Sequence, residues 1–165
     1  MAFGFEIIKD GIFKRTYTVY DLAQDIEVFQ AEVIGMFRPE IIISEINGYE
    51  GLRCIKAKGW NERWSVEKNG ISLFEFYSSG GICSGEYIIK LGSKIYRAPR
   101  SMSSFYEFHD DIGKIVFSFN RRTFSGNCIV EVREDFEPMV AISTAFILNF
   151  IFEQQVTAAG VVAAT

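Results

Sequence analysis

The sequence predicts a mainly β protein, a closed antiparallel β-barrel of about 12 strands around a buried hydrophobic C-terminal α-helix. Three observations lead to this fold. Short segments of alternating apolar and polar residues follow one another from Phe5 to Val132, with turn residues between them. The chain is rich in β-branched and aromatic residues, including 16 Phe, which favours strands. A single uncharged apolar stretch, Pro138–Phe152, follows the last of these segments.

The predicted strands are separated by short turns. In chain order, the strand-bearing segments are IFKRTYTVYD (12–21), IEVFQAEVI (26–34), EIIISEI (40–46), LRCIKAK (52–58), RWSVEKNGISLFEFYS (63–78), GEYIIKLGSKIYRA (85–98), SFYEFHDDIGKIVFSFN (104–120) and GNCIVEV (126–132). Asn69-Gly70 supplies the two positive-φ positions of a tight hairpin turn, and LAQD, Asn47-Gly48, Gly92-Ser93 and DDIG mark further turns. Many short strands at such regular spacing are typical of a barrel or a sandwich.

The apolar stretch Pro138–Phe152 lies between Glu137 and Glu153. As a helix it reaches about 22 Å, which is short of a hydrocarbon core roughly 30 Å thick, and no Lys or Arg cluster flanks it. Its polar residues lie at scattered angles, so the helix is apolar all round and needs protein or lipid around it. A barrel of this size has a lumen that its own side chains cannot fill, and we therefore predict that the helix lies inside it.

These elements predict one domain, residues 1–155, with the central helix at about 138–154 and a flexible tail at 156–165. On a helix buried in this way, the amide of Asn149 must find a hydrogen-bond partner on the barrel wall.

Charge and cysteine content restrict the class of protein. The net charge of −4 argues against a general nucleic-acid binder. Cys54, Cys83 and Cys128 are too widely spaced for a zinc site or a disulfide framework, which predicts reduced, buried thiols. The opening MAFGFEIIKDG has no secretory-signal pattern, so we expect a cytoplasmic protein.

Enzymatic chemistry has little support, and we predict no catalytic residues, no metal and no cofactor. His109 stands next to Asp110 and Asp111 and could form a small metal site, but a turn in which the Asp side chains cap their own backbone explains the same residues. No nucleophile elbow, phosphate-binding loop or dinucleotide-binding motif occurs. Cys83 is interpreted as a structural cysteine at a strand end.

Five segments of the chain together resemble a known family. They are YTVYD (17–21), IEVFQAEV (26–33), MFRPEIIISE (36–45), IGKIVFSFNRRTFSGNCIVEV (112–132) and AISTAFILNFIFE (141–153). Their order resembles the phospholipid scramblase branch of the tubby C-terminal-like superfamily, to which the LURP-one-related proteins are neighbours. The resemblance implies a twelve-stranded barrel closed around a hydrophobic C-terminal helix, and association with phospholipid or phosphoinositide. The family's acidic, calcium-associated segment corresponds here to Asn120–Asn127, which is basic and has no carboxylate.

One window of the sequence is basic and free of acids. Between Glu86 and Glu107, cations alternate with aromatic residues, and two further arginines follow in the chain. The candidate headgroup-binding residues are Lys90, Lys94, Arg97, Arg100, Arg121 and Arg122. Such a surface could hold an anionic lipid headgroup, whereas the simpler interpretation is a solvated hairpin face. Trp60 and Trp64 could sit at a membrane interface, but core positions in the barrel wall suit them better.

The leading functional hypothesis is a non-enzymatic phospholipid- or phosphoinositide-binding domain that acts peripherally at membranes through the 87–106 hairpin. The first alternative is a soluble ligand-binding or protein-interaction barrel without membrane contact. The second is a membrane-anchored phospholipid scramblase in which Pro138–Phe152 is the anchor.

Overall fold

The computed structural model describes residues 2–11, 14–35, 37–47, 50–59, 61–80, 84–101, 103–122 and 125–164. Within these residues the chain forms 12 β-strands followed by one α-helix. The strands are β1 (Ala2–Lys9), β2 (Thr16–Asp21), β3 (Ile26–Ile34), β4 (Glu40–Glu45), β5 (Glu50–Lys56), β6 (Arg63–Lys68), β7 (Ile71–Ser79), β8 (Glu86–Leu91), β9 (Lys94–Pro99), β10 (Phe105–His109), β11 (Ile115–Arg121) and β12 (Cys128–Arg133), and the helix is α1 (Pro138–Ala164).

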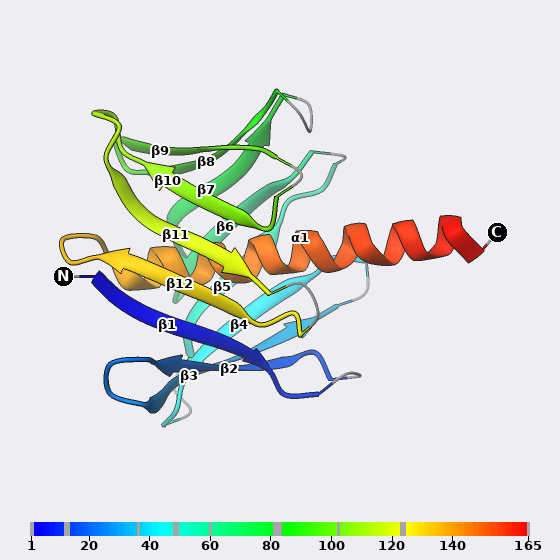
Figure 1. The fold of residues 1–165 in the computed structure, drawn as a ribbon, viewed down its shortest axis with the longest axis horizontal. Helices are drawn as coiled ribbons and strands as arrows, with labels where there is room; N and C mark the ends of the chain where they lie inside the picture. Colours follow the sequence, from blue (N-terminus) through cyan, green and yellow to red (C-terminus); the bar gives the residue numbers. More distant parts are fainter. Residues whose placement is uncertain are drawn as a thin grey trace.

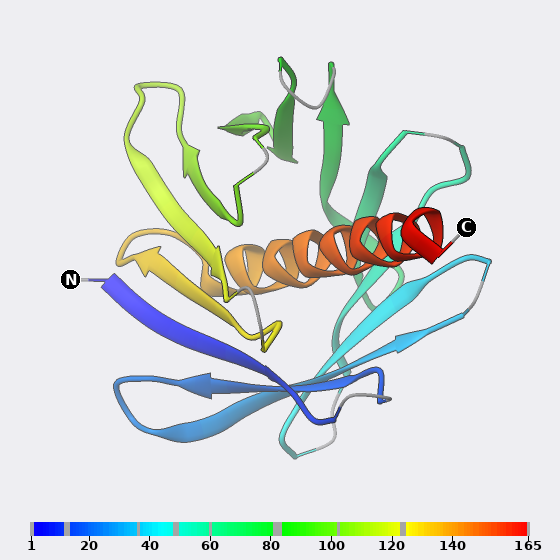
Figure 2. The same ribbon diagram turned by 45° about the vertical axis from the view of Figure 1, so that its right-hand side comes forward.

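The strands form one closed barrel in which every strand pairs with its neighbours in sequence. All pairings are antiparallel, and β1 closes the ring by pairing with both β2 and β12. Figures 1 and 2 show this ring of strands surrounding α1. The predicted closed antiparallel barrel is therefore confirmed. Because consecutive strands run in opposite directions, successive connections lie alternately at the two ends of the barrel.

The alternation in the sequence becomes an alternation between the inside and the outside of the barrel. In β6, for example, Trp64 and Val66 are fully buried, whereas the residue that follows each of them, Ser65 and Glu67, is partly exposed. The turn after β6 has positive φ at both Asn69 (52°) and Gly70 (77°), as the sequence predicted. The core position preferred for Trp64 is likewise confirmed.

The interior of the barrel is filled by α1. All residues from Val140 to Ile151 are buried, so the predicted burial of the helix is confirmed. Wall aromatics pack edge-on against it, with ring centroids 5.6 Å apart for Tyr17–Phe146 and 5.4 Å apart for Trp64–Phe150. In the described part of the chain, this is the one helix long and apolar enough to cross a membrane, and 67% of its apolar window is buried inside the protein.

The helix is longer than predicted. It continues to Ala164, ten residues beyond the expected end near Gln154, and includes most of the segment predicted as a flexible tail. The segment after Gln155 is rich in Ala and has no proline, so nothing in it stops a helix that has already begun.

Strand β2 begins at Thr16, four residues later than predicted. Ile12, Gly48, Trp60, Cys83 and Met102, on which other predictions fell, lie outside the described residues.

Candidate functional site

The barrel has two distinct ends, which we call the exit end and the far end. The exit end is the end at which α1 leaves the barrel (Figure 2). This end is bounded by the connections 10–15, 35–39, 57–62, 80–85, 100–104 and 122–127. The far end, where α1 begins, is bounded by the connections 22–25, 46–49, 69–70, 92–93, 110–114 and 134–137.

The two ends carry opposite charge. The exit-end connections contain six cations and two acids, whereas the far-end connections contain one cation and six acids. At the exit end these are Lys14, Arg15, Arg38, Lys58, Arg100 and Arg122 with Asp10 and Glu62; at the far end they are Lys114 with Asp25, Asp110, Asp111, Glu134, Asp135 and Glu137. The exit end is thus a basic face on an acidic protein, and such an asymmetry attracts anions to that face.

A pocket of about 280 Å³ lies at the exit end between the connections that follow β3 and β5. We call it the exit pocket; it is lined by Phe37, Arg38, Pro39, Lys56, Ala57, Lys58 and Gly59. Three of these residues are cations and none is an acid. The backbone N–H of Lys56 donates to the carbonyl oxygen of Pro39 at 3.4 Å, which joins the two walls.

The turn that forms one wall of the exit pocket requires glycine. Gly35 has a φ of +82°, and a Cβ atom at this position would clash with the carbonyl oxygen of Arg38. The neighbouring connection supports the turn, because Arg15 Nη1 donates to the carbonyl oxygen of Gly35 at 3.2 Å. The turn leaves Phe37 96% exposed beside the cations.

Within the part of the chain that the structure describes, two of the three pocket cations have no ion-pair partner. Lys56 Nζ is 3.3 Å from Glu62 Oε1, and the other oxygen of Glu62 accepts a hydrogen bond from Trp64 Nε1 at 3.0 Å. For the exposed side chains of Arg38 and Lys58, the described residues contain no such partner. Both are therefore available to an external anion.

The six residues predicted to bind a headgroup do not form one surface. Lys90 and Lys94 lie next to the far-end turn between β8 and β9, and Arg97 forms an ion pair with Glu86 at 2.8 Å on the outer wall. The other three, Arg100, Arg121 and Arg122, lie at the exit end. The hairpin thus spans the length of the barrel, and its cations are distributed along it.

Two of these arginines are engaged within the protein. Arg100 Nη1 donates to the carbonyl oxygen of Gly80 at 3.3 Å, and its guanidinium lies 5.1 Å from the centre of the Tyr87 ring. Arg121 Nε donates to Asn149 Oδ1 at 2.9 Å, and its guanidinium lies 5.7 Å from the Phe152 ring centre. The predicted wall partner of Asn149 is thereby confirmed, and it is one of the residues that the sequence had suggested for lipid.

A polar network surrounds α1 where it leaves the barrel. Glu153 accepts hydrogen bonds from the Tyr17 hydroxyl at 3.0 and 3.1 Å and pairs with Lys9 Nζ at 3.3 Å. Burial and the nearby Glu153 carboxylate raise the pKa of Tyr17, so its hydroxyl stays protonated as a donor. Together with the Arg121–Asn149 bond, these contacts fix the position of the helix at the exit end.

The described thiols are poor nucleophiles. Cys54 and Cys128 are buried and free, as predicted. Burial raises the pKa of Cys54 well above its ordinary value and that of Cys128 to about 12, so both stay protonated at neutral pH.

The HDDIG segment forms a turn. Asp110 Oδ1 accepts hydrogen bonds from the backbone N–H groups of Ile112 at 3.2 Å and Lys114 at 2.8 Å, which confirms the capping role preferred from the sequence. Among the described residues, no three His, Cys, Asp or Glu side chains gather into a group that could hold a metal ion.

Comparison with known proteins finds no matching family model and no matching curated protein. The resemblance to the scramblase branch therefore stays a prediction from the sequence, and the function has to be argued from the molecule itself.

The exit pocket was not predicted from the sequence. Its signal is present in MFRP (36–39) and KAKGW (56–60), where large apolar residues stand next to cations. These two segments lie about 20 residues apart, and only the pairing of β4 with its neighbours on both sides brings them together.

Proposed function

We propose that this protein associates peripherally with membranes by binding the anionic headgroups of phospholipids at the exit pocket. The observation that supports this most directly is the exit pocket, whose described lining has no acid and includes two cations, Arg38 and Lys58, with no ion-pair partner among the described residues. A phosphate in this pocket can be met by charge from both walls. Each cation near an anionic membrane surface contributes about 1 kcal/mol to binding.

Apolar groups at the same end support contact with a lipid surface. Phe37 is almost fully exposed beside the pocket, and Val156 is 61% exposed on the emerging helix. Each of the six exit-end connections also contains a large apolar residue in its sequence: Ile12 and Phe13, Met36 and Phe37, Trp60, Ile82, Met102, and Phe124. Apolar residues next to cations are the composition of proteins that bind the membrane interface without crossing it.

The proposed ligand, an anionic phospholipid, is the one predicted from the sequence. The proposed binding surface is the exit pocket and not the predicted 87–106 hairpin. The 87–106 hairpin contributes Arg100 to the exit end, while its other cations lie farther along the barrel. The resemblance to the scramblase branch implies the same class of ligand. In this proposal the protein is cytoplasmic and binds lipid without catalysing a reaction.

The test is sedimentation with phosphatidylcholine vesicles that contain phosphatidylserine. We expect the double variant Arg38→Gln, Lys58→Gln to bind about 30-fold more weakly than the original protein, because two contributions of about 1 kcal/mol are lost. Binding should also weaken as salt is added, since these cations are exposed and salt screens them.

The matched control removes two exposed cations from the far end, as Lys68→Gln, Lys90→Gln. It has the same net charge as the test variant, and we expect its vesicle binding to stay within about twofold of the original protein because its changes lie outside the contact surface. Equal weakening of both double variants would mean that net charge alone controls binding, and it would exclude the exit pocket as the site.

A further inference from the structure

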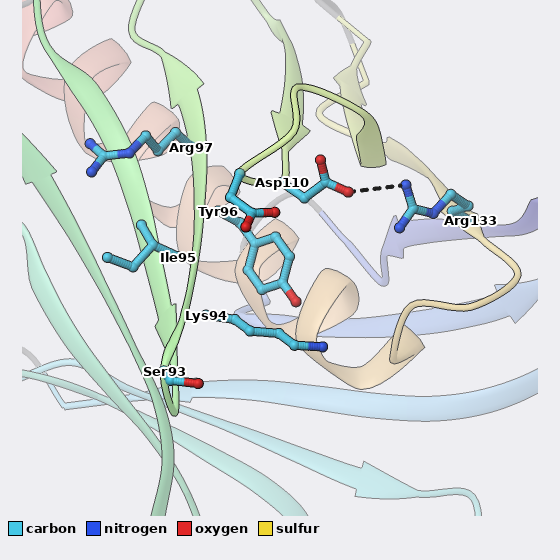
Figure 3. A pocket seen from close by; sticks show the side chains of 8 residues that line it. Ser93, Lys94, Ile95, Tyr96, Arg97, Asp110 and Arg133 are labelled. Carbon is cyan, nitrogen blue, oxygen red and sulfur yellow. Dashed lines mark hydrogen bonds and ion pairs between the residues drawn. The ribbon is translucent and has the colours of Figure 1, made fainter.

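Among the described residues, the barrel wall has its fewest backbone pairs between β9 and β10. These strands share a single bridge pair, Arg97 with His109, whereas β8 and β9 share six pairs. Toward the far end the two strands separate around a cleft of about 690 Å³ (Figure 3). One wall of the cleft is the run of residues 93–97, and the other is formed by Asp110, Asp111 and Arg133.

The edge of β9 that faces this cleft carries free backbone groups. The N–H of Arg100 bonds to the carbonyl oxygen of Gly85, so the backbone of Arg100 faces β8. Backbone direction alternates along a strand, and therefore Ile95, Arg97 and Pro99 face β10. Pro99 has no N–H and Arg97 pairs with His109, which leaves the N–H and C=O of Ile95 without a partner strand in the described chain.

One cation in the cleft, Lys94, has no ion-pair partner among the described residues. Figure 3 shows Lys94 and Tyr96 extending from β9 into the cleft, while Ile95 and Arg97 point to the other side of the strand. Arg133 is paired with Asp110 at 3.4 Å and also contacts Asp135. The described residues offer the exposed ammonium of Lys94 no ion pair.

We propose that this cleft binds an extended peptide segment, which pairs with β9 at Ile95 and places one acidic side chain against Lys94. Adding a strand to an exposed sheet edge is a common mode of peptide recognition, in which backbone hydrogen bonds supply affinity and side-chain contacts supply specificity. Asp111 on the facing wall disfavours a second acid near it. Among the cleft residues that the structure describes, a small anion would find one unpaired cation, Lys94, whereas a peptide also uses the free backbone groups of Ile95. This site lies at the end opposite the exit pocket and does not rest on the proposed lipid binding.

The test is amide hydrogen exchange followed by NMR, with a short N-acetylated peptide of alternating valine and serine around one central glutamate. In the free protein we expect the Ile95 amide to exchange quickly and the Tyr96 amide, which faces β8, to exchange slowly. At saturating peptide we expect the exchange of Ile95 to slow at least about tenfold, while Tyr96 is unchanged, because exchange then requires the new backbone bond to open. The same peptide N-methylated at its pairing residue should leave Ile95 unprotected.

Charge variants test the proposed contact between Lys94 and the acidic side chain of the peptide. Lys94→Glu should weaken peptide binding about fivefold, as expected for one partly exposed ion pair replaced by a repulsion. Lys90→Glu is the matched control, since it makes the same change on the same hairpin outside the cleft, and we expect unchanged binding. The proposal is overturned if the peptide leaves Ile95 unprotected, whether or not it binds elsewhere. Equal weakening by the two variants, or protection of Ile95 by inorganic phosphate alone, also overturns it.

Discussion

Thr144 and Asn149 are polar side chains buried on the same helix, and they meet different surroundings. Asn149 Oδ1 accepts hydrogen bonds from Arg121 Nε at 2.9 Å and from Cys128 Sγ at 3.5 Å. In the part of the chain that the structure describes, Thr144 Oγ1 has no hydrogen-bond partner. A buried hydroxyl in that state costs about 1–3 kcal/mol of folding free energy.

We therefore expect Thr144→Val to raise the free energy of unfolding by about 1 kcal/mol, because valine keeps the branched shape and removes the unsatisfied hydroxyl. Asn149→Ala should instead lower it by about 2 kcal/mol or more, since the Arg121 guanidinium loses its acceptor and a cavity remains. Urea unfolding measures both changes. A destabilised Thr144→Val variant would contradict the first expectation and indicate that the hydroxyl is satisfied in solution, for instance by a buried water.

At the scale of single residues, the sequence predicts that a buried polar side chain needs a hydrogen-bond partner, but it does not predict which residue that partner is. A buried amide has to be paired, so the need of Asn149 for a wall residue could be read from the apolar stretch around it. That the partner is Arg121 depends on how far α1 extends into the barrel, which no local pattern contains. For the same reason Arg121 looked available to lipid, although its guanidinium is turned toward α1.

At the scale of elements, α1 was predictable in kind and position but not in length. From Val140 to Ile151 every side chain is buried, and an uncharged stretch with no polar face indicates this from sequence alone. Beyond Gln155 the residues are small and mostly outside the barrel, so periodicity carries no signal there. The continuation depends on the helix propensity of alanine and on a helix already started, which is a weaker constraint than burial.

The two parts of α1 should respond differently to truncation of a side chain. Phe146 is 2% exposed and packs against the Tyr17 ring, so we expect Phe146→Ala to lower the free energy of unfolding by about 3–5 kcal/mol. Val156→Ala, on the emerging segment, should change it by less than about 0.5 kcal/mol. Thermal and urea unfolding of both variants check this. A similarly small loss for both would show that α1 does not supply the packed interior of the barrel.

At the scale of the whole molecule, the charge asymmetry follows from the alternation of connections in an up-and-down barrel. Once the strand order is known, every second connection belongs to the same end, and the cations of MFRP and KAKGW fall together with those near Lys14 and Arg122. A charge comparison within one window of the chain does not combine these connections. It therefore selected the 87–106 hairpin, a unit in sequence, whereas the basic surface is assembled from five connections distant in sequence.

The asymmetry predicts how the barrel is oriented on a membrane. Phe37 at the exit end is 96% exposed and Ile112 at the far end is 71% exposed, so each can be replaced by Cys and labelled with a polarity-sensitive fluorophore, with Cys83→Ser in both variants. The buried Cys54 and Cys128 thiols have raised pKa values and should react slowly with the label. On vesicles that contain phosphatidylserine, we expect the emission of the label at position 37 to shift to the blue, because the exit end enters the apolar interface, and the label at 112 to stay in water. A blue shift at 112 without one at 37 would place the acidic end on the lipid and reverse the proposed orientation.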